Sequence, residues 1–219
     1  RFKPAGQGPL ELRDVPVPRL GPADILVRVS CCGVCHTDLH TVEGELAGVR
    51  LPRIPGHEVI GTVEKRGERA KRFKAGDRVG AAWLHSACGT CRFCRHGSHS
   101  MCPQFRATNL DPCGFAGRIR VPALNAAQAV LRVPDHLPDE AAIFVEPLGC
   151  ALRAARRSDV QPGDRVAVAG AGAMGLLIAQ AVQAHARRDQ RQHGVGHGGA
   201  VARDRLRERQ AVAHRHHRH

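Results

Sequence analysis

The chain is poor in aromatic side chains. Its 219 residues contain no Tyr, one Trp and six Phe, so aromatic residues make up only 3% of the sequence. Hydrophobic residues nevertheless account for 42%, which is enough for a substantial core. We therefore expect a core built mainly from Val, Leu, Ile and Ala, in one large domain or two ordinary ones.

The sequence also lacks a long uninterrupted apolar run. Its most apolar stretch, residues 166–182, is broken by three glycines and contains Gln180. We therefore expect no membrane-spanning helix and no membrane partner. No apolar signal region follows Arg1, which favours a cytoplasmic protein. Because the sequence does not begin with Met, we expect a few starting residues to be missing.

The net charge of +13 would ordinarily indicate a nucleic-acid partner. Its distribution argues against one. Residues 185–219 contain nine Arg and three acidic residues, for a net charge of +6, and seven of the 14 His. Nearly half of the basic excess thus lies in a tail unlike the rest of the chain, and we expect no nucleic-acid partner.

The tail itself, residues 185–219, has few and scattered aliphatic residues. Such a segment cannot bury enough apolar surface to offset the entropy lost on ordering, so we expect it to be disordered. Its composition changes inside a βαβ unit that cannot close without its next strand. This position favours out-of-frame translation of a truncated gene. A natural basic tail that binds metal or nucleic acid is the alternative.

Residues 1 to about 130 read as all-β. Short strand-forming runs at 25–29, 59–64 and 78–82 are separated by Gly and Pro. Helical signal begins near Asp139, and we expect Pro147 to divide that stretch into two segments. A Pro-Gly-Asp turn then leads into an alternating strand at 165–169.

A glycine-rich turn follows that last strand. Gly170, Gly172 and Gly175 precede a helix-forming run that extends to about Ala184. In a dinucleotide-binding turn, the first glycine permits the tight turn, the second permits close approach of phosphate, and the third permits helix packing. The helix N-terminus adds amide donors and a positive dipole end. The strand–GxGxxG–helix context therefore predicts cofactor binding, with a packed Gly/Ala-rich turn as the alternative.

Four cysteines lie within fifteen residues, in the pattern C-x2-C-x2-C-x7-C. Such short loops can direct four thiolates at one tetrahedral zinc ion, with Zn–S distances of about 2.3 Å. An iron–sulfur cluster and disulfides are the rival interpretations. Disulfides fit less well because the chain carries no secretory signal. We therefore expect a structural zinc ion bound by Cys88, Cys91, Cys94 and Cys102.

A second set of potential metal ligands is spread along the chain. GVCHTDLH contains Cys35, GHE contains His57 and Glu58, and EPLGC contains Glu146 and Cys150. A thiolate, an imidazole and a carboxylate or second thiolate can hold zinc while leaving one position open, as in catalytic sites. Taken singly, each residue has a structural alternative, such as a core cysteine, a turn histidine or an acid at a helix N-terminus.

Together, these motifs resemble those of the zinc-dependent medium-chain alcohol dehydrogenases. The matching segments are GVCHTDLH, PGHEVIGTV, the cysteine quartet, EPLGCAL and GAGAMG, in the family order over residues 1 to about 184. The resemblance implies an α/β protein. A β-rich GroES-like catalytic domain would occupy 1–150 and the start of an incomplete Rossmann domain 151–184, with 185–219 as the tail. It also implies a homo-oligomer in the full-length parent.

The resemblance further implies a catalytic zinc ion. Cys35 and His57 match two of its ligands, and Glu146 matches the third, as in the polyol and threonine dehydrogenase branches. Glu58 resembles the neighbouring acid that can approach the metal. Cys150 is then expected to be a buried core thiol.

Other roles follow from the same resemblance. Thr37 and His40 resemble a proton relay from bound alcohol to solvent, and Asp38 resembles a residue that orients a zinc ligand. His36 resembles the residue that touches the cofactor phosphate. Trp83 occupies a position at which family members line the substrate pocket.

The implied reaction is oxidation of an alcohol or polyol with NAD or NADP as the hydride acceptor, by a protein with one structural and one catalytic zinc ion, of which this chain is expected to be a C-terminally truncated copy. A non-enzymatic zinc-binding remnant of such a dehydrogenase shares all these motifs and is the alternative. A basic nucleic-acid-binding zinc ribbon is a third hypothesis, but it gives the glycine-rich unit no role. The chain departs from the family at Gly117 and Arg118, where an FAEY-type sequence is common.

Overall fold

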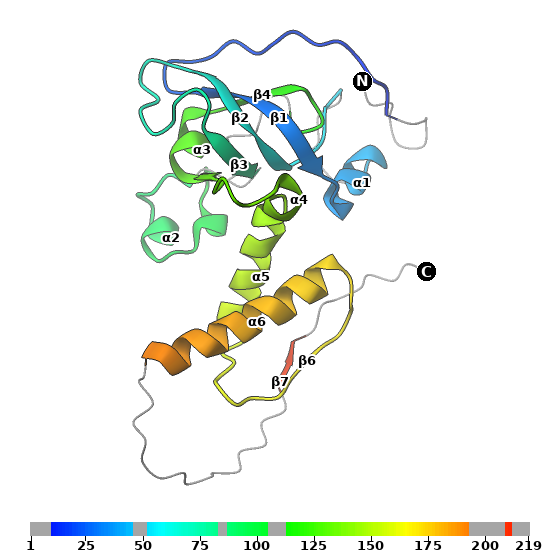
Figure 1. The fold of residues 1–219 in the computed structure, drawn as a ribbon, viewed down its shortest axis with the longest axis vertical. Helices are drawn as coiled ribbons and strands as arrows, with labels where there is room; N and C mark the ends of the chain where they lie inside the picture. Colours follow the sequence, from blue (N-terminus) through cyan, green and yellow to red (C-terminus); the bar gives the residue numbers. More distant parts are fainter. Residues whose placement is uncertain (1–9, 46–51, 83–86, 105–112, 193–208, 212–219) are drawn as a thin grey trace. The chain divides into compact units, whose positions relative to one another are not determined.

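The computed structural model of the chain describes residues 10–45, 52–82, 87–104, 113–192 and 209–211 (Figure 1). The chain divides into two compact units, Arg1–Glu146 and Pro147–His219. Trp83 lies outside the described residues, as does most of the tail that the sequence predicts to be disordered.

The first unit is built on a five-stranded antiparallel sheet. Its strands lie in the order β4-β1-β2-β3-β5 (Figure 1). The strands predicted at 25–29, 59–64 and 78–82 are confirmed, and the first two are longer than predicted. The bounds are β1 Ile25–Gly33, β2 Glu58–Arg66, β3 Arg78–Ala82, β4 Arg118–Val121 and β5 Val130–Arg132.

The core of this unit is aliphatic, as the scarcity of aromatic residues predicts. Alternate residues of β1 and β2 point into it, because side chains alternate across a strand. Phe73 is the one aromatic residue in its main cluster. The fully buried side chains of that cluster include Ile25, Val27, Val79, Ile119, Val121 and Val130.

The prediction that this region is all-β is wrong, because short helices join the strands. They are α1 (His36–Val42), α2 (Arg92–Arg95), the 3-10 turn η1 (His99–Met101) and α3 (Ala123–Gln128). Helix α4 (Asp139–Ala142) follows, where the sequence predicts helix. Cys35 is not a typical N-cap residue, so the start of α1 carries a weak sequence signal. Its helix is instead capped by Asp38, whose side chain accepts a hydrogen bond from the Cys35 amide at 3.0 Å.

The helical region from Asp139 contains two helices, but Pro147 does not separate them. The break falls at Ile143 and Phe144, between α4 and α5 (Val145–Arg157). Pro147 lies in the first turn of α5, where its missing N–H costs nothing. The expectation that Cys150 is a buried thiol is also wrong, because Cys150 is exposed. The buried face of α5 passes through Ala151 and Ala155, which lie on a different side of the helix.

The second unit contains most of α5, a short strand and a long helix. β6 (Val166–Val168) precedes α6 (Ala173–Gln192) and pairs in parallel with β7 (Arg209–Ala211). Its core is a small cluster of Ala and Val residues from α5, α6 and the connection between α5 and β6. Helix α6 extends eight residues beyond Ala184, because Ala, Gln and Arg there favour helix propagation. These residues and β7 therefore have regular structure within the segment predicted to be disordered.

Within the described part of the chain, no helix combines the length and apolar character needed to cross a bilayer. The apolar start of α6 is followed by charged and polar residues.

Candidate functional site

The four cysteines of the quartet come together between β3 and β4. Cys91 caps α2, Cys94 lies within that helix, and Cys102 follows η1. All four sulfur atoms lie within 4.8 Å of one another. The Sγ atom of Cys94 is 3.4 Å from that of Cys91 and 3.9 Å from that of Cys88.

These distances distinguish among disulfides, a single metal ion and an iron–sulfur cluster. A disulfide requires an S–S distance of about 2.05 Å, which is far shorter. Four sulfurs at about 2.3 Å from one tetrahedral ion would lie about 3.8 Å apart, close to the observed separations. In an iron–sulfur cluster the ligands bind different iron atoms, which spreads the sulfurs more widely. The quartet therefore fits a single tetrahedral ion.

The thiols of Cys88 and Cys94 differ in pKa because their surroundings differ. Hydrogen bonds from the Thr90 hydroxyl and the Cys91 amide lower the pKa of Cys88 to about 6. Burial, together with the neighbouring sulfurs, raises the pKa of Cys94 to about 12. Zinc binds thiolates, so metal binding at this site must displace protons.

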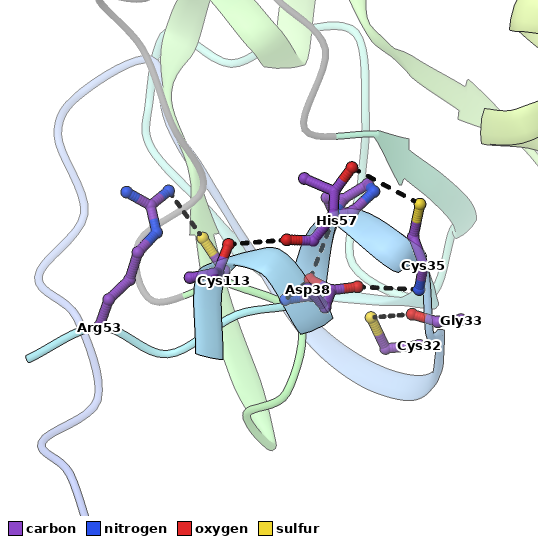
Figure 2. Close-up of polar contacts among 10 residues, drawn as sticks. Cys32, Gly33, Cys35, Asp38, Arg53, His57 and Cys113 are labelled. Atoms are coloured by element: carbon purple, nitrogen blue, oxygen red, sulfur yellow. Dashed lines mark hydrogen bonds and ion pairs between the residues drawn. The ribbon is translucent and has the colours of Figure 1, made fainter. Parts of the chain in front are cut away.

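Asp38 organises the second group of predicted ligands. Its buried carboxylate accepts hydrogen bonds from the amides of Cys35 at 3.0 Å and Gly56 at 2.8 Å. It also lies 3.3 Å from Nδ1 of His57 (Figure 2). Burial opposes ionisation of Asp38, but the hydrogen bonds from His57 and the two amides prevail and lower its pKa. One carboxylate thus fixes the start of α1 to the start of β2.

His57 is itself buried, with 6% of its surface exposed. Burial alone would lower its pKa, but the hydrogen bond and charge of Asp38, followed by the contribution of Cys35, raise it to about 9. Nδ1 faces Asp38, so Nε2 is the ring nitrogen on the side away from that carboxylate and the candidate metal ligand. A carboxylate on the second nitrogen of a ligating histidine is the usual way to orient such a ligand.

The ligand atoms of Cys35, His57 and Glu58 lie within 4.8 Å of one another. Burial raises the pKa of Glu58, and the adjacent His57 opposes that shift. Glu146 is not a member of this trio. Burial also raises the pKa of Glu146. The charge of His57 opposes this shift and the charge of Glu58 reinforces it, so Glu146 lies close enough to interact with both. The structure therefore brings together three of the four predicted catalytic-site ligands and places the fourth nearby.

The other predicted residues of this site are on α1. The Thr37 hydroxyl lies 3.8 Å from the Cys35 sulfur and accepts its hydrogen bond. The rings of His36 and His40 meet edge to face, with centroids 4.7 Å apart. Nδ1 of His40 contacts the carboxylate of Glu45, a residue that the sequence analysis missed. Gly44, four residues after His40, could have indicated that contact, because a glycine commonly ends a helix and turns the following residue back towards it.

The glycine-rich turn gives each of its three glycines a different environment. Gly170 has a φ of +107°, which favours glycine. A Cβ atom on Gly175 would lie 1.9 Å from the carbonyl oxygen of Gly170, so the turn and α6 pack too closely for a side chain. A Cβ on Gly172 would meet nothing within 4 Å. Packing within the protein therefore does not require glycine at this position, whereas the close approach of a ligand would.

The chain is similar to known alcohol dehydrogenases both in sequence and in structure. The probable alcohol dehydrogenase AdhA of Mycobacterium tuberculosis is 41% identical over 188 residues, which cover 81% of this chain and 52% of that protein. The structure of alcohol dehydrogenase TADH from Thermus sp. ATN1 matches with a TM-score of 0.68 and 34% identity, over 78% of this chain and 51% of that one. CAD from Helicobacter pylori, complexed with NADP(H), matches with a TM-score of 0.64 and 27% identity, over 77% and 50%.

The chain thus spans about half the length of the relatives that it matches. These similarities confirm the predicted fold class, a β-rich GroES-like domain followed by an α/β unit of the Rossmann kind. Residues 21–135, more than half of the chain, match the model of the alcohol dehydrogenase GroES-like domain. The chain therefore belongs to the alcohol dehydrogenase family that this GroES-like domain defines.

Proposed function

We propose that this protein is a zinc-dependent oxidoreductase that oxidises an alcohol or polyol with NAD or NADP. The observation that carries the proposal is the convergence of Cys35, His57 and Glu58, separate from the cysteine quartet. A sulfur, a nitrogen and an oxygen donor form a ligand set that suits zinc and leaves a position for substrate. The alcohol dehydrogenases among the relatives support the reaction class.

Two carboxylates compete for the third ligand position. The family resemblance favours Glu146, whereas proximity favours Glu58. Both side chains are partly buried and both have a raised pKa. A neighbouring cation would therefore stabilise the ionised form of either one. We propose that Cys35 and His57 are ligands in either case.

When bound, zinc would supply Lewis acidity towards the alcohol oxygen and nicotinamide would supply a hydride acceptor. The chain's own residues then have three tasks. Asp38 holds the His57 ring and the start of α1 in place through its three hydrogen bonds. Thr37, whose hydroxyl lies beside Cys35, receives the alcohol proton, and His40 passes it to solvent.

The glycine-rich turn supports the cofactor assignment. Open space beside Gly172, at the start of the 20-residue helix α6, suits the pyrophosphate of a dinucleotide. The relative complexed with NADP(H) is consistent with this assignment. His36, exposed at the start of α1, is proposed to contact the cofactor phosphate.

The test combines zinc content with turnover. Elemental analysis of the full chain should give up to two zinc ions, and His57→Asn should remove one of them. Reduced nicotinamide should form with at least one member of a panel of primary alcohols, secondary alcohols and polyols, and the His57→Asn variant should not form it. Comparing Glu58→Gln with Glu146→Gln identifies the third ligand. Turnover that survives His57→Asn would refute the proposed role of this site. Two bound zinc ions without turnover would instead support a non-enzymatic zinc-binding protein.

A further inference from the structure

Helix α1 ends in a turn that depends on Gly44. Gly44 has a φ of +75°, a conformation that favours glycine. Its amide donates to the carbonyl of Thr41 at 3.3 Å, and the amide of Glu45 donates to the carbonyl of His40 at 2.9 Å. This pair of hydrogen bonds defines a Schellman motif.

The motif brings two particular side chains together. In a Schellman motif the residue after the glycine packs against the side chain whose carbonyl it caps, and that contact is commonly apolar. Here the two positions hold Glu45 and His40, and the carboxylate of Glu45 contacts Nδ1 of the imidazole. The His40 side chain is 37% exposed and that of Glu45 is 25% exposed, so neither is fully solvated.

This contact fixes the hydrogen on the neutral His40 ring. A glutamate carboxylate is only an acceptor when ionised, so Nδ1 must carry the hydrogen. Nε2, on the opposite side of the ring, is then left with a lone pair that can accept a proton. Among the described residues, His36 also approaches the ring edge on, and Glu43 belongs to the same group, whose ligand atoms lie within 4.8 Å of one another.

We propose that Glu45 is a positioning residue for His40. It holds the imidazole in the Nδ1–H tautomer and in one orientation, so that Nε2 is available as the proton acceptor at the solvent end of the relay. The contact itself stands on the structure alone, whereas its catalytic meaning rests on the proposed function. The main-chain bonds of the Schellman motif do not involve the Glu45 side chain, so its removal should leave α1 intact.

The tautomer of His40 can be measured directly. In ¹⁵N NMR spectra of the full chain, assigned with a His40→Asn variant, neutral His40 should be the Nδ1–H form. Glu45→Ala should move the population towards Nε2–H, whereas Glu45→Gln, which keeps an acceptor oxygen, should retain Nδ1–H. Glu43→Ala is the matched control on the same turn and should change nothing. A wild-type His40 in the Nε2–H form, or one that ignores Glu45→Ala, overturns the proposal.

Turnover separates this inference from the proposed function. With zinc content unchanged, Glu45→Ala should lower kcat for alcohol oxidation about tenfold, the range seen when partners of ligands and catalytic groups are removed. Glu45→Gln should recover most of that loss. A changed tautomer with unchanged kcat refutes the positioning role but leaves the zinc chemistry standing. If the unsubstituted chain has no turnover, the proposed function fails, and the NMR result alone decides whether Glu45 sets the tautomer.

Discussion

Replacing Gly56 by alanine should destabilise the first unit more than the same change at any glycine in an open turn. Gly56 has a φ of +95°, which costs an L-residue roughly 1–2 kcal/mol. A Cβ atom there would also lie 2.7 Å from the amide nitrogen of Phe115 and 2.8 Å from the Cys32 sulfur. The Phe115 amide cannot move away without losing its 2.9 Å hydrogen bond to the Pro55 carbonyl, so overpacking should add about 1–3 kcal/mol.

Two other glycines allow the conformational cost and the packing cost to be measured separately. Gly76 has a φ of +90° but open space around its Cα, so Gly76→Ala measures the conformational cost alone. Alanine also restricts the unfolded chain, which returns about 0.4–1 kcal/mol, so the net cost should be about 1 kcal/mol. Gly61 lacks the positive φ, but its Cβ would lie 2.3 Å from the Arg28 carbonyl oxygen, so Gly61→Ala measures packing. Gly56→Ala should therefore cost about 2–4 kcal/mol, a large share of the typical 5–15 kcal/mol for a domain.

Urea denaturation at constant zinc concentration and pH provides the measurement. Far-UV circular dichroism follows the unfolding, and because all of these substitutions lie in the first unit, the differences between variants report on that unit. The urea concentration at the midpoint should be highest for the wild type, lower for Gly76→Ala and lowest for Gly56→Ala. If Gly56→Ala costs no more than Gly76→Ala, the close approach of Phe115 and Cys32 does not constrain this turn, and the reasoning fails.

Three further predictions concern metal, pH and a buried amide. Cys94→Ser should remove one zinc ion per chain by elemental analysis, whereas the same change at the exposed Cys150 should remove none. In zinc-free protein, the pKa of His57 is raised from 6.5 to about 9, so its pairing with Asp38 contributes fully below pH 6.5 and is lost as pH rises through 9. The free energy of unfolding, from urea denaturation at each pH, should fall across that window by an amount on the order of 3 kcal/mol, and should not do so in Asp38→Asn. Asn125 is fully buried, and its side-chain nitrogen and oxygen have no hydrogen-bond partner in the described structure. Asn125→Leu should therefore leave the melting temperature unchanged or raise it. A melting temperature lowered by several degrees would contradict this reasoning.

The sequence predicts most reliably where local pattern and chemistry agree. The segments 25–29, 59–64 and 78–82 are short strand-forming runs separated by Gly and Pro, and each is a strand in the structure. The quartet is predictable because the three loops between its cysteines are short and keep the four sulfur atoms close together. Gly170 and Gly175 likewise meet the requirements expected of the first and third glycines of the motif, a positive φ and close packing of the turn against the helix.

Other features depend on tertiary structure. No local pattern shows that Asp38 would cap α1 and also accept the amide of Gly56, because those residues are eighteen positions apart. The exposure of Cys150 depends on which face of α5 packs, and a Cys in an Ala-rich helix does not reveal it. The contact between His40 and Glu45 could have been predicted, since the glycine between them is a common helix terminator.

The strand order has a consequence for folding kinetics. β1 pairs with β4, and β4 follows β3 only after residues 83–117, a connection of 35 residues that contains the cysteine quartet. Zinc bound by the quartet, as proposed, would close a 15-residue loop within that connection and shorten the effective chain between the strands to about 20 residues. Because the entropy of loop closure varies only with the logarithm of length, this saves roughly 0.5 kcal/mol. The rate at which β4 joins the sheet should therefore rise only about twofold when zinc is bound, so the quartet acts on the stability of its own lobe far more than on the speed with which the sheet assembles.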